Sequence, residues 1–304
     1  MTTEFRSGFV SLIGRPNAGK STLLNALVGQ KVAIVADKPQ TTRTSIQGVL
    51  TLPEAQIVFA DTPGIHKADT PLNKRLMDTV RGALEERDLL LFVADATRKF
   101  NEDDRRAIDI ARRHKTPVVL VLNKIDLLKD KAHLLPLIEE YKAVFEFAEY
   151  VPVSSVKKIG LDQLRAVILK YLPTGPAYFP EDYVTDQPER FLASELIREK
   201  VLLATRQEVP HAVAVTVDRW EETPKITRIY ATIHLERDGQ KAIVIGSGGS
   251  MLKQIGTQAR QEMERLFEVK IYLDLHVHVQ PGWRQNRAFL NALDWRTMAG
   301  EDDA

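Results

Sequence analysis

The chain of 304 residues has no cysteine, which excludes disulfides and thiolate metal sites and fits a reducing compartment. It also has no run of about 18 apolar residues, so the sequence predicts no membrane span. The first residues, MTTEFRSGFVSLIG, carry an early acid and no long apolar stretch, which argues against a signal peptide. We therefore expect a cytoplasmic protein, with peripheral attachment to the inner face of the cell membrane as the open alternative.

An excess of charge of either sign is lacking too, because 42 Lys and Arg residues nearly balance 41 Asp and Glu residues. Bulk charge therefore indicates neither a nucleic acid nor a membrane as partner. Residues 181–304 carry 16 basic and 20 acidic residues, whereas residues 1–180 carry 26 and 21. Since the later part is acidic as a whole, any binding of nucleic acid there must depend on a local feature.

The length indicates two domains, and up to about residue 172 short apolar runs alternate with amphipathic stretches. This alternation is typical of an α/β fold, a doubly wound, mostly parallel sheet of six strands with helices on both faces. We expect helices near 19–28, 73–86, 102–114, 134–147 and 161–171. The expected strands are Phe9–Ile13, Gln56–Ala60, Leu89–Ala94, Val118–Leu122 and Tyr150–Val153, with Ile46–Leu50 as an added edge strand.

Residues 173–188 are predicted to be a linker, because four prolines and a glycine interrupt LPTGPAYFPEDYVTDQP. The pattern then changes to a helix, two alternating segments, a glycine cluster, a second helix near 250–267 and a strand near 270–279. The first helix runs from about 188 to 207, and the alternating segments 211–220 and 226–235 resemble a hairpin. The predicted domains are thus 1–172 and 189–304, the second of α+β type.

A glycine-rich loop follows the first expected strand and opens the first expected helix. Its sequence, GRPNAGKST, fits G-x-x-x-x-G-K-[ST] in the context that this phosphate-binding motif requires. Backbone N–H groups of such a loop point at phosphates, Lys20 reaches the β- and γ-phosphates, and the Ser21 hydroxyl ligates Mg²⁺. The predicted nucleotide contacts of this loop are Gly14, Arg15, Pro16, Asn17, Ala18, Gly19, Lys20, Ser21 and Thr22.

The second Mg²⁺ element should be an acid at the end of a later strand, and QIVFADTPG supplies Asp61 there. Thr62 and Pro63 follow it, and the backbone N–H of Gly64 can meet a γ-phosphate. The predicted nucleotide contacts from this stretch are Asp61, Thr62, Pro63 and Gly64.

Between the two motifs lies KPQTTRTSI, which contains Thr41 and Thr42. A threonine in this mobile segment completes the Mg²⁺ shell when the γ-phosphate is present. Both threonines are candidates, and we favour Thr42. The predicted metal ligands are then Ser21, Thr42 and Asp61, and the predicted catalytic groups are Lys20, Thr42 and Gly64.

The run NKID after the strand VVLVL predicts guanine specificity. The Asp126 carboxylate can accept hydrogen bonds from the guanine N1–H and 2-amino groups, which adenine does not offer. Asn123 and Lys124 would brace the loop and cover the base. The run VSS ends the sixth strand, and a backbone N–H at Ser154 or Ser155 can meet the guanine carbonyl oxygen.

The P-loop, PQTTR, DTPGIHK, NKID and VSS, in this order, resemble the Era GTPases of the TrmE-Era-EngA class. The resemblance covers nearly the whole chain and implies a P-loop NTPase domain followed by a type II KH domain. In Ras-like GTPases a glutamine after DxxG orients the attacking water. Ile65 takes that place here, which predicts slow intrinsic hydrolysis. The resemblance also implies a K⁺ ion beside Asn17, with a tolerant loop residue as the alternative.

The segment AIVIGSGGSMLKQIGTQAR resembles the core of a KH domain, whose GxxG loop clamps about four nucleotides of single-stranded nucleic acid. The periodicity of KAIVIG alone predicts a strand, whereas the resemblance implies a short helix. Ser247 and Gly248 stand where KH loops carry Lys or Arg, and His276 and His278 replace basic residues of the last strand. The predicted RNA contacts are Lys241, Gly246, Ser247, Gly248, Gly249, Lys253, Arg260, Trp283 and Arg284.

We expect a GTP/GDP switch in which GTP and Mg²⁺ order the Thr42 and Gly64 segments. By resemblance, the partners are the 3′ end of small-subunit ribosomal RNA and the 30S subunit, whose biogenesis the protein assists, and no DNA partner is expected. The alternative is an interaction protein at the membrane surface that binds GTP and hydrolyses it negligibly. A GTPase for tRNA modification or the large subunit is disfavoured by the single P-loop domain, and an ATPase by Asp126.

Overall fold

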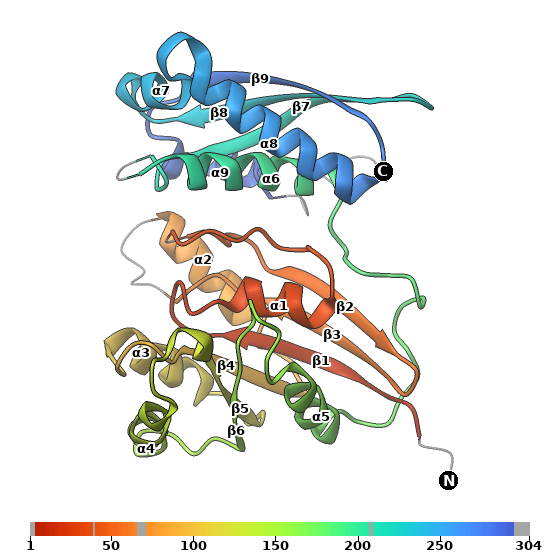
Figure 1. Ribbon diagram of the computed structural model, residues 1–304, viewed down its shortest axis with the longest axis vertical. Coiled ribbons are helices and arrows are strands. Elements are labelled where there is room, and N and C mark those ends of the chain that lie inside the picture. The colour runs from red at the N-terminus through yellow and green to blue at the C-terminus, as the bar shows by residue number, and fades with distance from the viewer. Residues whose placement is uncertain (1–3, 39, 66–70, 207–208, 295–304) are drawn as a thin grey trace. The chain divides into compact units, whose positions relative to one another are not determined.

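The computed structural model describes residues 4–38, 40–65, 71–206 and 209–294. Contacts divide the chain into two compact units, with the division along the later chain between Asp186 and Gln187. The helices and strands of both units are labelled in Figure 1. No helix in the described ranges combines the length and the apolar character that crossing a bilayer requires.

The first unit contains a six-stranded sheet in the order β2-β3-β1-β4-β5-β6 within the described residues. All neighbouring strands run parallel except β2, which pairs antiparallel to β3 at the edge. The predicted sheet and its added edge strand are therefore confirmed. The strands are β1 (Arg6–Ile13), β2 (Ile46–Leu52), β3 (Ala55–Asp61), β4 (Leu89–Asp95), β5 (Val118–Asn123) and β6 (Glu149–Pro152).

Helices cover both faces of this sheet (Figure 1). Its inner strands carry apolar side chains on both sides, and the helices bury them. One apolar cluster joins the sheet to α1 and α5, and a second joins it to α2, α3 and α4. Within β4, Leu91 faces the first cluster and Leu90 the second. The helices are α1 (Lys20–Val28), α2 (Pro71–Gly82), α3 (Glu102–Ala111), α4 (Leu134–Lys142) and α5 (Leu161–Tyr171).

The predicted linker segment lies along the first unit over most of its length. The N–H of Val49 in β2 donates to the carbonyl of Val184, and the side chain of Gln56 bonds the backbone of Tyr178 and Phe179. The prolines stop regular structure, and these hydrogen bonds then fix the segment. The residue limits of the two predicted domains remain a prediction.

In the part of the second unit that the structure describes, a three-stranded sheet, β7-β8-β9, packs one face against α6 and α8. Strands β7 and β8 pair antiparallel, as the hairpin pattern predicts, and β9 pairs parallel to β8. The run KAIVIG is helical, so the strand predicted by its periodicity is wrong and the helix implied by resemblance is confirmed. The elements are α6 (Glu189–Ala204), β7 (Ala214–Glu222), β8 (Thr227–Leu235), α7 (Asp238–Ile245), α8 (Ser250–Phe267), β9 (Ile271–Val279) and α9 (Arg287–Ala292).

Candidate functional site

The loop between β1 and α1 has a backbone that requires glycine at two positions. A Cβ atom on Gly14 would lie 2.3 Å from the carbonyl oxygen of Val93 in β4. Gly19 has a φ of 92°, in the left-handed region, and a Cβ there would lie 2.4 Å from the Asn123 side chain. The loop is therefore pressed against the ends of β4 and β5, the edge of the sheet where α/β proteins bind ligands.

Lys20 begins α1 and points back into this loop. Its Nζ donates to the carbonyls of Gly14 and Arg15, each at 3.1 Å. Burial lowers the pKa of Lys20 to about 8, although the nearby Asp61 opposes that effect. A phosphate in the loop would supply the negative charge that this buried ammonium group lacks.

Three oxygen-bearing side chains converge beside Lys20. The Ser21 hydroxyl donates to Asp61 Oδ2 at 2.5 Å, and the Thr42 hydroxyl donates to the same oxygen at 3.2 Å. The two hydroxyl oxygens lie 2.8 Å apart. Asp61 is fully buried, and its Oδ1 has no hydrogen-bond partner among the described residues. Hydroxyl and carboxylate oxygens are ligands that Mg²⁺ prefers, so this set fits the predicted metal.

The two threonine candidates differ in where their hydroxyl groups bond. The Thr41 hydroxyl donates to the carbonyls of Lys38, at 2.6 Å, and Ala36, at 3.1 Å, within its own loop. The Thr42 hydroxyl instead contacts both Ser21 and Asp61. Of the two, Thr42 is therefore the one placed to complete a metal shell, as we favour from the sequence.

The loop after β3 places Gly64 against the P-loop and Ile65 in the core. A Cβ added to Gly64 would lie 2.8 Å from Pro16 Cα, and the N–H of Ile65 donates to the carbonyl of Gly14 at 3.4 Å. The Ile65 side chain is 1% exposed and packs in the cluster with α2 and α3. Thr62 is turned into the sheet, where its hydroxyl donates to the carbonyl of Leu12. The Ile65 side chain is therefore buried in the core and does not extend towards a bound phosphate.

Asn123 connects the P-loop, the NKID run and the VSS run. Its Oδ1 accepts from the N–H groups of Lys124 and Ser155, and its Nδ2 donates to the carbonyl of Ala18 at 3.1 Å. Asp126 is exposed, and its Oδ1 accepts from the Ser154 hydroxyl at 2.6 Å. The Asp126 carboxylate is therefore held in place by Ser154 and open to solvent, which is compatible with its predicted role as an acceptor for guanine.

Two acids of this site carry no sequence motif that predicts their role. Asp95 accepts a hydrogen bond from Lys124 Nζ at 2.9 Å, and Asp104 forms a buried salt bridge with Arg15 at 3.0 Å. Asp95 ends β4 as Asp61 ends β3, which is a signal available in the sequence. Asp104 has the spacing of a helix-capping residue after Asn101, and its pairing with Arg15 depends on the fold.

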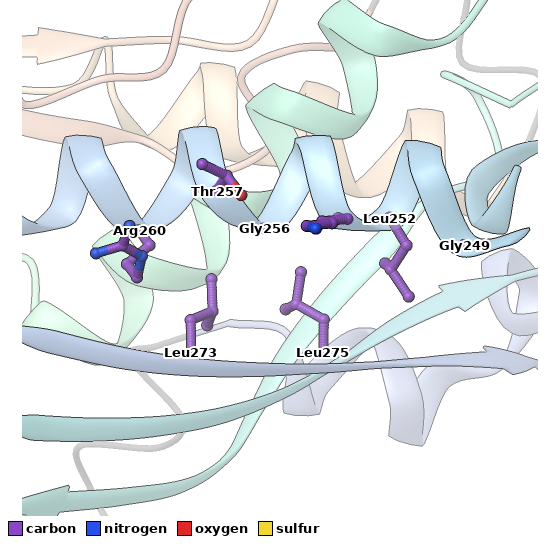
Figure 2. Close-up of a pocket in the computed structure, with 8 residues that line it drawn as sticks. Gly249, Leu252, Gly256, Thr257, Arg260, Leu273 and Leu275 are labelled. Carbon is purple, nitrogen blue, oxygen red and sulfur yellow. The ribbon is translucent and has the colours of Figure 1, made fainter.

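The second unit has a groove of about 370 Å³ between α8 and β9 (Figure 2). The turn 246–249 lies at the start of α8, and Gly256 leaves space opposite Leu275, whose Cδ1 would lie 3.3 Å from an added Cβ. Figure 2 shows leucines from both elements facing this space. The lining residues are Gly249, Leu252, Lys253, Gly256, Thr257, Arg260, Leu273 and Leu275.

The predicted RNA contacts divide into two groups around this groove. Gly249, Lys253 and Arg260 line it, although Arg260 also pairs with Glu264 at 2.9 Å. Lys241 lies in α7, and Gly246, Ser247 and Gly248 form the turn that leads into α8.

The last two predicted RNA contacts lie on the segment after β9. Trp283 is 1% exposed and donates through Nε1 to the carbonyl of Ala212, so this burial does not fit its predicted contact with RNA. Arg284 pairs with Glu236, which offsets its charge.

Comparisons with known proteins agree over both units. The model of the 50S ribosome-binding GTPase family matches residues 9–124, and that of the KH domain matches residues 208–284. GTPase Era of Nostoc sp. (strain PCC 7120) is 48% identical over 295 residues, which are 96% of this chain and 90% of that protein.

Two solved structures of Era are equally similar to this chain. One is an Aquifex aeolicus Era variant bound to GDP·AlF4⁻, and the other is Era in complex with MgGDPNP and nucleotides 1506–1542 of 16S ribosomal RNA. Each is 41% identical, with a TM-score of 0.92 over 96% of this chain and 99% of the other. The order of the motifs, the two folds and this similarity over nearly the full length show that the chain belongs to the Era family of GTPases.

Proposed function

We propose that this protein is a GTP-dependent switch that binds single-stranded RNA from the 3′ end of small-subunit ribosomal RNA and assists 30S biogenesis. The nucleotide-binding part of this proposal rests on one observation. The side chains of Ser21, Thr42 and Asp61 converge beside Lys20, and Asp61 Oδ1 has no hydrogen-bond partner among the described residues. The α8–β9 groove supports the RNA half. The related Era that is bound to MgGDPNP and 16S ribosomal RNA supports both.

The residues of the first unit would divide the work on GTP. The P-loop N–H groups and Lys20 would hold the phosphates, while Ser21, Thr42 and Asp61 would hold Mg²⁺. When bound, Mg²⁺ neutralises the charge on the β- and γ-phosphates. Asp126 would select guanine, and the N–H of Gly64 would contact the γ-phosphate. Release of that phosphate would remove a contact of the Thr42 and Gly64 segments, which would then become less ordered.

The burial of Ile65 supports slow hydrolysis in the isolated protein. Its side chain lies in the core and carries no group that could hold water. Asn17 is exposed in the P-loop, so its side-chain oxygen is available to a K⁺ ion. We expect single-turnover hydrolysis to be faster in K⁺ than in Na⁺, and the Asn17→Ala variant to lose that difference. A rate no faster than that of GTP in buffer, with K⁺ and RNA present, would favour the interaction protein that only binds GTP.

The groove can be tested separately with fluorescent RNA of the 16S 3′-terminal sequence. Lys253 is exposed on the groove wall, so Lys253→Glu should weaken binding by about tenfold, because phosphate contacts carry much of the affinity. Lys225→Glu changes the same charge in the β7–β8 turn and serves as the matched control. Equal losses in both variants would show that only overall charge matters, and would contradict binding in the groove.

A further inference from the structure

The ammonium group of Lys124 connects two loops that are distant in sequence. Its Nζ donates to the backbone carbonyl of Asn17 in the P-loop at 2.7 Å and to Asp95 Oδ2 at 2.9 Å. Lys124 itself follows β5, with a φ of 68°. The Lys124 side chain thus crosses from the guanine-binding loop to the P-loop, and the Asp95 carboxylate fixes the position of its ammonium group.

Asp95 is itself held on its other side. It is the last residue of β4 and 3% exposed, and its Oδ1 accepts from the N–H of Thr97 at 2.9 Å and the Thr97 hydroxyl at 2.6 Å. The exposed Arg98 lies 3.9 Å from Oδ2. Burial alone would raise the pKa of Asp95, but the hydrogen bonds from Thr97 and Lys124 outweigh it and lower the pKa below its ordinary value. The carboxylate is therefore ionised at neutral pH.

We propose that Asp95 is a positioning residue for nucleotide binding, which fixes Lys124 across the P-loop before the nucleotide arrives. A lysine side chain has many rotamers, and ordering it during binding lowers affinity. Asp95 removes this cost because the side chain is already ordered. GTP and GDP share the contacts of the guanine-binding loop, so the effect is the same for both. The inference rests on the proposed nucleotide site.

The first test is Asp95→Asn, which keeps the shape of the side chain and an acceptor for Thr97 but removes the charge that faces Lys124. We expect it to weaken the binding of MgGTP and MgGDP alike by about 3- to 10-fold. KM for GTP should rise while kcat stays the same, since the ground state and the transition state lose the same binding energy. In a Lys124→Met background, Asp95→Asn should have no further effect on affinity.

Thr97→Val is the matched control, because it removes one hydrogen bond to Asp95 and leaves the Lys124 pair. Its affinity should stay within about twofold of the original chain. Asp95→Glu keeps the charge and should bind nucleotide more tightly than Asp95→Asn. If Asp95→Asn does not fold, the affinity of Asp95→Glu is compared with that of the original chain, alone and in the Lys124→Met background. Unchanged affinity in a folded Asp95→Asn variant, or an equal loss in the Lys124→Met background, would overturn the proposal. If the unaltered chain binds no guanine nucleotide, the proposed function fails instead.

Discussion

Arg15 of the P-loop and Asp104 in the first turn of α3 form a salt bridge that is closed to solvent, with Nη1 3.0 Å from Oδ2. The two side chains are 5% and 0% exposed. Burial raises the pKa of Asp104 above its ordinary value, although Arg15 opposes this shift. The positive charge of Arg15 in the P-loop is therefore paired inside the protein.

Breaking this pair should destabilise the first unit. Asp104→Ala leaves the Arg15 charge buried without a partner, which costs about 3–5 kcal/mol of unfolding free energy. Replacing both partners, as Arg15→Met with Asp104→Leu, should recover most of that loss, because apolar groups of similar size need no partner there. Urea unfolding of the single and double variants measures both values, and a double variant no more stable than Asp104→Ala would contradict the argument.

The affinity for GTP should depend on pH through Lys20. Its pKa is about 8 without nucleotide, and a bound phosphate raises it, so binding takes up a proton above that pH. Affinity should be flat near neutral pH and then fall by up to about tenfold per pH unit above pH 8. Titration calorimetry at pH 8.5 in two buffers of different ionisation enthalpy detects the proton. Equal heats in both buffers would show that Lys20 keeps its charge in the free protein.

Replacing Ile65 after DTPG by the glutamine that Ras-like GTPases carry there should not create a fast GTPase. Ile65 is buried in the core, so Ile65→Gln places an amide among apolar side chains instead of beside the γ-phosphate. We expect a loss of about 1–3 kcal/mol in stability and no gain in kcat. Ile65→Val, which stays apolar, is the control and should cost about 1 kcal/mol. A rise in single-turnover rate for Ile65→Gln would mean that the side chain leaves the core.

The preference for guanine over xanthine should depend on one side-chain atom of Asp126. Asp126→Asn replaces an acceptor with a donor, which matches the carbonyl that xanthine carries in place of the 2-amino group. We expect the variant to lose GTP binding by at least about 100-fold and to prefer xanthosine triphosphate. Competition between the two nucleotides for a fluorescent GDP analogue measures the change. A retained preference for GTP would contradict the assignment of Asp126.

The sequence points to a nucleotide site through contiguous motifs placed at strand ends. In the structure Ser21 bonds Asp61, and Asn123 bonds the P-loop at Ala18, so these motifs lie at the same loop. The position of Asp95 at a strand end is visible in the sequence, but the partners of Asp95 and Asp104 are not, since a single acid acquires a partner only when distant elements pack.

Residues of the second unit show the same limit. Trp283 is an aromatic residue of the kind that contacts RNA, yet its side chain is buried. Its Nε1 donates to the carbonyl of Ala212, and the centroids of its ring and the Phe289 ring lie 5.7 Å apart. The helix at KAIVIG differs from its local period because α7 packs on α8, β8 and β9, so tertiary contacts outweigh a short apolar pattern.

The place of β9 late in the sequence sets the order in which the residues of the two sites are synthesised. The predicted nucleotide contacts end at Ser155, whereas the groove is lined by Leu273 and Leu275 of β9. At about 5–20 residues per second, the roughly 120 residues between them take about 6–24 seconds to synthesise. The residues predicted to contact nucleotide are thus synthesised well before those that close the groove.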